Sequence, residues 1–244
     1  MTFDMKTAIF TYILINYLYT FVLGFLWYQS RQRSWGTGFL LADFLFKSIG
    51  MTLAILRGSL PPVISVVFAN FLMFSGSIFM LFGMGAFLKV RLSRTPYLFY
   101  TLLFTALYAW FALVQPDVRV RIMLFSGMLT PVLIHMSALV FTSKEAALRK
   151  YAHHAGIAFS LFALVSVARF ACALTGDPIS GYFNKPITDS VLTIVCQVLS
   201  IYLAYAIYLM INGRLSHVSE GEGKRLKRLA LTDTPEEIDI QIHS

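Results

Sequence analysis

Seven apolar runs, each long enough for a membrane-spanning helix, follow one another along the chain with short polar connections between them. A helix of about 20 residues crosses a hydrocarbon core of about 30 Å. The runs do not alternate between polar and apolar positions, and the bilayer offers no water to unpaired backbone groups, so helices are predicted. The expected fold class is an all-α integral membrane protein, a bundle of seven transmembrane helices at 7–28, 36–56, 62–87, 96–114, 120–141, 151–174 and 188–211.

The amino-acid composition is that of a membrane protein. Of the 244 residues, 57% are hydrophobic and 13% are charged. An ordinary globular domain has about 25% charged residues, so about half of the usual charge is missing. We therefore expect residues 1–212 to form a transmembrane domain, and the polar residues 213–244 to form a cytoplasmic linker or tail.

Basic residues lie mostly on one side of the predicted bundle. The connections after the first, third and fifth runs, together with the tail, hold 13 of the 20 Lys and Arg residues, whereas the N-terminus and the other connections hold five. Because cytoplasmic loops are enriched in Lys and Arg, we expect the N-terminus outside and the C-terminus in the cytoplasm. The net charge of +8 then reflects orientation and attraction to anionic lipids, and nucleic-acid binding is not expected.

Asp43 and Lys47 are ionisable residues within the second apolar run. Each such group costs about 2.5–3.5 kcal/mol to insert into a bilayer, so it needs a partner or an aqueous route. Their spacing places both on one helix face, with the carboxylate a turn before the ammonium. Two interpretations stay open: a structural pair facing the bundle interior, or a switch pair that a ligand, a proton or the membrane potential breaks.

Other polar side chains lie near the outer mouth of the predicted bundle. Arg169, in the sixth run, can extend toward the head groups or toward Asp177 or Asp189. Amide side chains such as Asn70 and Gln197 join transmembrane helices by hydrogen bonds. As an alternative, a pocket for an anionic or polar ligand is predicted from Arg57, Asn70, Arg169 and Gln197.

The sequence carries no recognisable catalytic or metal-binding motif. It lacks a Gly-rich phosphate loop, a Gly-x-Ser-x-Gly elbow and a His-Glu-x-x-His pair. Methionines of the third run stand at helical spacing beside Gly76 and Gly83, which is typical of core packing. Cys172 and Cys196 are expected to pack as small apolar residues, with a disulfide between them as the alternative. We therefore expect no enzyme activity, no metal and no cofactor.

The polar tail contains an amphipathic segment, KRLKRLAL, at 224–231. Its basic residues between leucines predict a membrane-surface helix or the start of a helical linker. The string LALTD at 229–233 resembles the segment that opens the GGDEF domain of bacterial membrane-bound diguanylate cyclases. Residues 10–90 resemble the membrane sensory half of those proteins, in WYQSR at 27–31, GFLLA at 38–42 and LRGSLP at 56–61. By this resemblance the linker to the output is formed by Leu226, Leu229, Leu231 and Asp233.

The chain departs from that family after Thr234. It continues PEEIDIQIHS and carries neither the Gly-Gly-Asp/Glu-Glu-Phe turn nor the metal-binding carboxylates of the cyclases. Cyclase activity is therefore not implied. We expect a shortened relative that keeps the sensory module, or a protein whose output is supplied by a separate partner.

The resemblance implies a sensory or signal-transducing module of a bacterial inner membrane. It would couple a membrane or periplasmic cue to a cytoplasmic output through the seventh helix and its linker, as a homodimer or with a cytoplasmic signalling partner. Two alternatives remain. One is a small transporter or channel-like protein with a polar path between its helices, and the other is a membrane scaffold that recruits a cytoplasmic partner through residues 224–231.

Overall fold

The computed structural model describes residues 5–30, 36–143, 146–175 and 187–232. Within these ranges the chain is helical and forms no β-strand. Seven of the described helical stretches are long and apolar enough to span a membrane, which confirms the predicted all-helical fold with seven such helices. The helices are α1 (Met5–Ser30), α2 (Thr37–Ile55), α3 (Ala69–Phe87), α4 (Thr95–Ala109), α5 (Val118–Phe141), α6 (Ala146–Thr175) and α7 (Ile187–Thr232), with π-helical segments η1 (Val63–Phe68) before α3 and η2 (Trp110–Val114) after α4.

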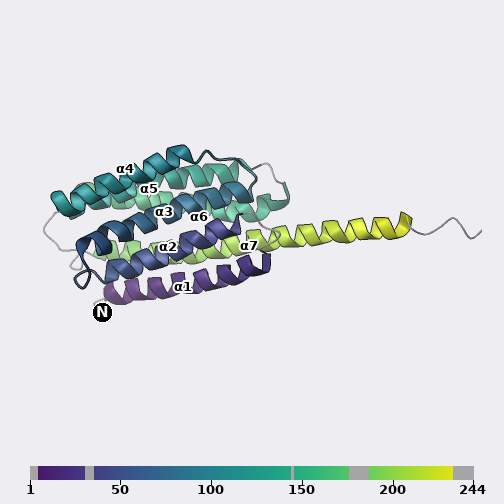
Figure 1. The fold of residues 1–244 in the computed structure, drawn as a ribbon, viewed down its shortest axis with the longest axis horizontal. Helices are drawn as coiled ribbons and strands as arrows, with labels where there is room; N and C mark the ends of the chain where they lie inside the picture. Colours follow the sequence, from purple (N-terminus) through teal and green to yellow (C-terminus); the bar gives the residue numbers. More distant parts are fainter. Residues whose placement is uncertain (1–4, 31–35, 144–145, 176–186, 233–244) are drawn as a thin grey trace, which may run out of the picture.

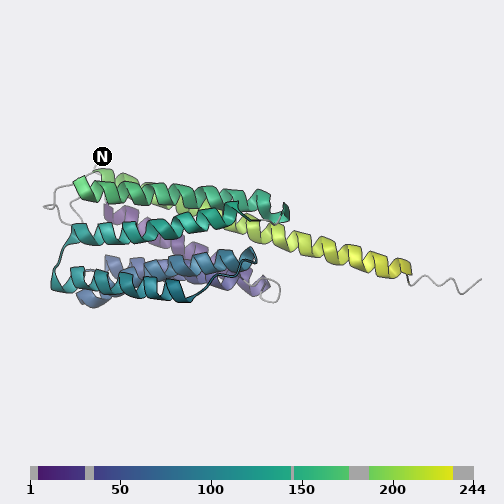
Figure 2. The same cartoon turned by 90° about the horizontal axis from the view of Figure 1, so that it is seen from above.

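Six of the seven helices form a closed ring. Going round it, α1 packs against α2, α2 against α3, α3 against α5, α5 against α6, α6 against α7, and α7 against α1. The remaining helix, α4, stands outside the ring and packs against α3 and α5. Figures 1 and 2 show the helices side by side, with their axes roughly parallel to one common direction. Six helices therefore enclose the interior of the bundle. α3 and α5 lie between α4 and this interior.

A seam of small residues brings α2 and α3 close together. Three pairs face each other at seven-residue intervals: Gly36 and Gly83, Asp43 and Gly76, and Gly50 and Ala69. A Cβ atom on Gly50 would lie 2.7 Å from the carbonyl oxygen of Ala69, and one on Gly76 would lie 3.0 Å from Oδ1 of Asp43. Small residues permit such close backbone approach between membrane helices. The seam holds the Asp43 side chain directly against the backbone of α3.

The outward faces of the bundle are apolar. On α1, the side chains of Phe10, Leu14, Phe21 and Phe25 lie on one face and are 61% to 75% exposed. A soluble monomer rarely exposes so large a continuous apolar surface. In a bilayer this face would contact lipid tails, so the pattern of exposure agrees with the membrane assignment.

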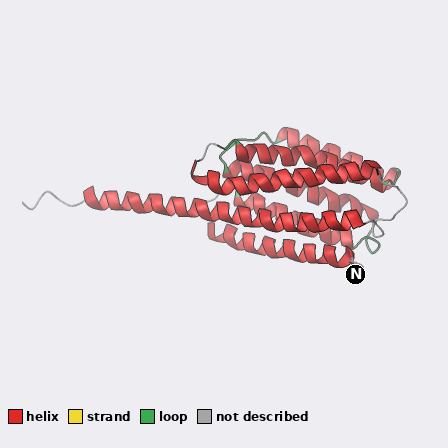
Figure 3. Ribbon diagram, turned by 180° about the vertical axis from the view of Figure 1, so that it is seen from behind, coloured by secondary structure: helices red, strands yellow, loops and turns green. Residues whose placement is uncertain are grey.

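α7 is a continuous helix of 46 residues, far longer than the predicted seventh span. At 1.5 Å per residue its length is about 70 Å, more than twice the hydrocarbon core of about 30 Å. Its apolar span is Ile194–Arg214, and residues 215–232 continue the same helix beyond the bundle. Figure 1 shows this extension in yellow-green, and Figure 3 shows it from behind. The leucines, lysines and arginines of this segment favour the helical conformation, so residues 215–232 form a helical extension of α7.

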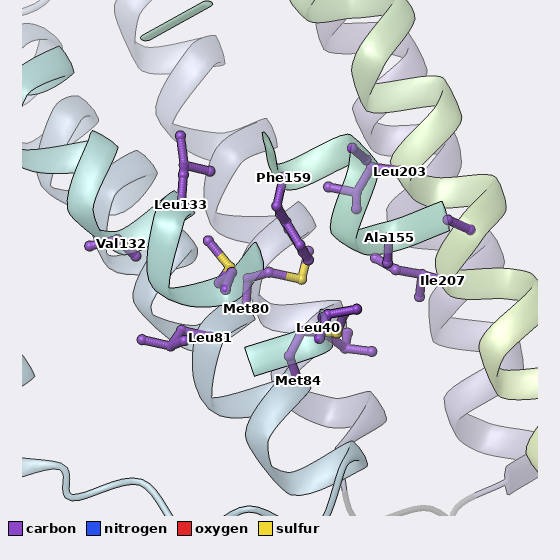
Figure 4. Close-up of a cluster of buried hydrophobic side chains, with 14 of the residues drawn as sticks. Leu40, Met80, Leu81, Met84, Val132, Leu133, Ala155, Phe159, Leu203 and Ile207 are labelled. Atoms are coloured by element: carbon purple, nitrogen blue, oxygen red, sulfur yellow. The ribbon is translucent and has the colours of Figure 1, made fainter. Parts of the chain in front are cut away.

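The apolar core draws buried side chains from all seven helices. Figure 4 shows Met80, Leu133, Phe159 and Leu203 close to one another, one each from α3, α5, α6 and α7. Met80 and Phe159 are each 1% exposed. Methionine fills irregular spaces between helices because its unbranched side chain adapts to its neighbours.

Candidate ligand cavity

A cavity of about 170 Å³ lies inside the ring of helices. All six ring helices contribute to its lining, whereas α4 contributes none of the lining residues. Most of the wall is apolar and includes Met80, Leu133, Phe159 and Leu203, the residues labelled in Figure 4. This arrangement gives the bundle an internal space that touches every ring helix, including α7.

Polar side chains line another part of the same cavity. Lys47 of α2 and Arg169 of α6 bring two cations to the wall, and Tyr12, Asn16 and Ser200 add hydroxyl and amide groups from α1 and α7. Such a mixture of an apolar wall and a few polar groups is typical of small-molecule sites. Charged groups within a membrane bundle are costly and are usually functional, which makes this cavity the candidate site.

Asp43 and Lys47 form an ion pair within α2. The Nζ atom of Lys47 lies 2.8 Å from both carboxylate oxygens of Asp43 and donates a hydrogen bond to Oδ2. The Asp43 side chain is fully buried against Gly76, while the Lys47 side chain is 29% exposed and reaches the cavity. The two opposite charges thus neutralise each other. The Asp43 carboxylate lies behind the cavity wall, and the Lys47 ammonium lies at the surface of that wall.

A hydrogen-bond chain links α1 to α7 at the cavity. Ser200 donates from its Oγ to the carbonyl oxygen of Cys196 at 2.9 Å. The Tyr12 hydroxyl lies 2.8 Å from Ser200 Oγ. Because the single hydroxyl proton of Ser200 is used in the bond to Cys196, Tyr12 acts as the donor in its hydrogen bond with Ser200. The Nδ2 atom of Asn16 donates to the carbonyl oxygen of Tyr12 at 2.8 Å. This chain fixes the relation between α1 and the cavity face of α7.

Arg169 faces the cavity rather than extending only toward the bundle end. Its guanidinium lies close enough to the Cys196 thiol and the Tyr12 hydroxyl to interact electrostatically with both. No carboxylate pairs with Arg169 among the side chains that the structure describes. Asp177 and the side chain of Asp189 lie outside the described residues.

Of the four predicted pocket residues, only Arg169 lines the cavity. Asn70 is buried in α3 and donates from Nδ2 to the carbonyl oxygen of Val66 at 2.7 Å. Arg57 lies in the turn after α2, and half-buried Gln197 is not part of the lining although its neighbour Cys196 is. The structure therefore places the predicted set at different points of the bundle, and it adds Tyr12, Lys47 and Ser200 to the site.

The predicted linker leucines lie away from the cavity. Leu226, Leu229 and Leu231 belong to the α7 extension, and Asp233 lies outside the described residues. Cys172 and Cys196 are both free thiols, so the alternative of a disulfide between them is not what the structure shows. Within the described residues no three His, Cys, Asp or Glu side chains gather as a metal site would require.

Comparisons of the chain with models of known protein families, with curated proteins and with solved structures found no match. The geometry of the cavity and the course of α7 are therefore the observations on which a function can be proposed.

Proposed function

We propose that this chain is a membrane sensory and signal-transducing module in which α7 couples the intramembrane cavity to a cytoplasmic output. The observation that supports this is the continuity of α7. Cys196, Ser200 and Leu203 line the cavity, and the same helix continues without interruption to Thr232. A displacement of α7 at the cavity therefore reaches the extension without crossing a flexible joint.

Polar contacts hold α7 at three levels of the bundle. Ser200 contacts Tyr12 of α1, and the hydroxyl of Tyr202 lies 3.0 Å from Nδ1 of His154 on α6. At the exit from the bundle, Arg214 donates to the carbonyl oxygen of Phe87 at 2.6 Å and also covers the Phe87 ring. Shifts of about 1–2 Å between packed helices are a common form of switching, and such a shift here would rearrange these few polar contacts.

The orientation and the partner belong to the same proposal. The excess of basic residues at the end where α7 emerges supports a cytoplasmic position of the extension, because positive residues are retained there. The resemblance of the tail to the linker of membrane-bound diguanylate cyclases suggests a bacterial inner membrane and pairing of two α7 extensions. The output would then come from a cytoplasmic partner that the paired helices bring together.

A distance measurement between the bundle and the α7 extension tests this proposal. Spin-labelled amino acids are placed at Thr142, at the end of α5, and at Ser216 of α7, both of which are exposed. Ser200→Leu partly fills the cavity and removes the contact with Tyr12, so it should shift the distance between labels by about 1–2 Å in lipid nanodiscs. The matched control is Val198→Leu, whose parent side chain is 58% exposed on the same helix.

The control variant should leave the distance unchanged. An unchanged distance in Ser200→Leu as well, with the helical content preserved, would refute coupling between the cavity and the extension. Crosslinks between cysteines introduced along 212–226 test the homodimer separately. Their absence across subunits would remove the dimer but not the coupling.

A small transporter is the second candidate, because the cavity with its two cations lies inside the membrane-spanning bundle. A transporter would move a solute down its gradient when the chain is reconstituted into liposomes, whereas a sensory module would bind without net transfer. Flux that is lost in Arg169→Gln would favour the transporter.

A further inference from the structure

We propose that the cavity binds a small amphiphilic monocarboxylate, with the acid group on Arg169 and an apolar body of about six carbon atoms among the methionine and phenylalanine side chains. The binding site is inferred from the cavity alone. Only the step by which binding would move α7 rests on the proposed function.

The charged side chains that line the cavity are those of Lys47 and Arg169. Lys47 is neutralised by Asp43, so it adds no net charge to the wall. Arg169 interacts with a thiol and a phenol, which are neutral groups, and no described carboxylate neutralises it. A cation in a membrane bundle is costly, and a monoanion beside the guanidinium offsets that cost. A dianionic phosphate would leave an excess negative charge in the same low-dielectric space.

The hydrogen-bond donors available in the cavity also favour a carboxylate ligand. Ser200 donates to Cys196, and Ser166 donates from its Oγ to the carbonyl oxygen of Ser126 at 3.0 Å. The Tyr12 hydroxyl proton is directed to Ser200. The donors that remain for a ligand are therefore mainly those of the two cations. The planar guanidinium of Arg169 matches a carboxylate in a two-point contact, which a lysine ammonium cannot make.

The size of the cavity limits the apolar body. A cavity of about 150 Å³ in another protein holds one benzene molecule. The present volume of about 170 Å³ is slightly larger and leaves little room beyond a six-carbon body. Phe159, Met80 and Met136 are almost fully buried and supply apolar surface on three different helices. Hexanoate and benzoate fit this description, acetate lacks the apolar body, and dodecanoate is too large.

Calorimetric titration of the full chain in nanodiscs tests this inference, with hexanoate and benzoate as probes. Hexanol, hexylammonium, acetate, dodecanoate and inorganic phosphate are the comparison compounds. Because a hydrogen-bonded charge contributes strongly to binding, hexanoate should bind at least about tenfold more tightly than hexanol. Titration of protein-free nanodiscs measures partitioning into lipid and is subtracted.

Three variants locate the site. Arg169→Gln should weaken hexanoate binding by about 10–100-fold, and Arg169→Lys should weaken it less because the charge is kept. Ser77→Leu adds volume at a lining position and should abolish binding while all charges remain. The matched control, Arg94→Gln, changes an exposed arginine outside the cavity and should bind hexanoate like the parent.

Several outcomes would overturn the inference. These are equal affinity for hexanoate and hexanol, tighter binding of phosphate than of hexanoate, or unchanged hexanoate affinity in folded Arg169→Gln and Arg169→Lys. The distance between labels at Thr142 and Ser216 separates this inference from the proposed function. Binding without a change in distance would support the ligand class and count against signalling, whereas a distance change in Ser200→Leu without hexanoate binding would do the reverse.

Discussion

Replacing Lys47 by Met removes the cation that neutralises a fully buried carboxylate. The ammonium lies 2.8 Å from both oxygens of Asp43, whose side chain has no exposed surface. Asp43 packs against the backbone of α3, since its Oδ1 and its backbone oxygen lie 3.0 and 3.1 Å from the position of a Cβ on Gly76. Breaking a buried ion pair by removing one partner costs about 3–5 kcal/mol. We expect Lys47→Met to lower the free energy of unfolding by this amount.

The single variant Asp43→Asn and the double variant complete a double-mutant cycle with Lys47→Met. We expect a different loss of unfolding free energy for each. Asp43→Asn keeps the shape of the side chain beside Gly76 and leaves the lysine unpaired, but the lysine is 29% exposed and reaches the cavity. Its cost should therefore be smaller, about 1–3 kcal/mol. The double variant carries no buried charge, and replacement of a whole buried pair is often neutral. We expect it to lie within about 1 kcal/mol of the parent chain, so that the two substitutions are strongly non-additive.

Equilibrium unfolding in mixed micelles, followed by circular dichroism, measures all four chains. A decrease in the free energy of unfolding below about 0.5 kcal/mol for Lys47→Met would refute the buried pair, because an unpaired buried carboxylate destabilises the fold by more than that. The distance between labels at Thr142 and Ser216 then separates the two interpretations of the pair. A structural pair leaves that distance unchanged in the double variant, whereas a switch pair shifts it.

Four further substitutions test other contacts. Gly50→Ala should destabilise by about 1–3 kcal/mol because the new Cβ would meet a backbone oxygen of α3 at 2.7 Å, whereas Gly24→Ala, with its nearest neighbour at 3.8 Å, should stabilise by about 1 kcal/mol. Lys89→Gly should stabilise by about 1 kcal/mol, since Lys89 has a φ of 57° at the end of α3. Arg214→Leu should lower stability by about 1.5–3 kcal/mol through the lost bond to Phe87. Thermal unfolding in detergent measures each change.

Each of these predictions has a contradicting result. Equal effects of the two glycine substitutions would show that α2 and α3 are not in close contact at Gly50. A destabilised Lys89→Gly variant would mean that the left-handed conformation carries no strain for lysine. An Arg214→Leu variant as stable as the parent would show that the exit of α7 is not held by α3.

The elements of the fold could be predicted from the sequence because helix formation in a bilayer depends on local properties. An apolar run of about 20 residues must satisfy its own backbone hydrogen bonds, which requires a helix wherever the run lies in the bundle. The contact between Asp43 and Lys47 was predictable for the same reason, since it joins neighbouring turns of one helix. The seven-residue spacing of Gly76 and Gly83 also indicated a close helix contact, although not its partner helix.

The candidate site depends on which helix faces meet, and this the sequence did not determine. Lipid tails and protein interiors are similarly apolar, so hydrophobicity does not mark the inner face of a membrane helix as it does in water. The closed ring, the position of α4 outside it and the gathering of Tyr12, Lys47, Arg169 and Ser200 around one cavity follow from packing. For the same reason Arg57, Asn70 and Gln197 were grouped with Arg169 in the prediction although they lie apart.

The sequence by itself determined that the chain consists of membrane-spanning helices with a basic polar tail, because length and hydropathy suffice for that. Only the tertiary structure decided that six helices enclose a cavity and that Arg169 faces it. It also joined residues 213–232 of the tail to the seventh span as the single helix α7. The physical reason is that side-chain direction and helix order around the ring arise from contacts between distant segments. Those contacts turn scattered polar residues into a candidate site linked to the tail.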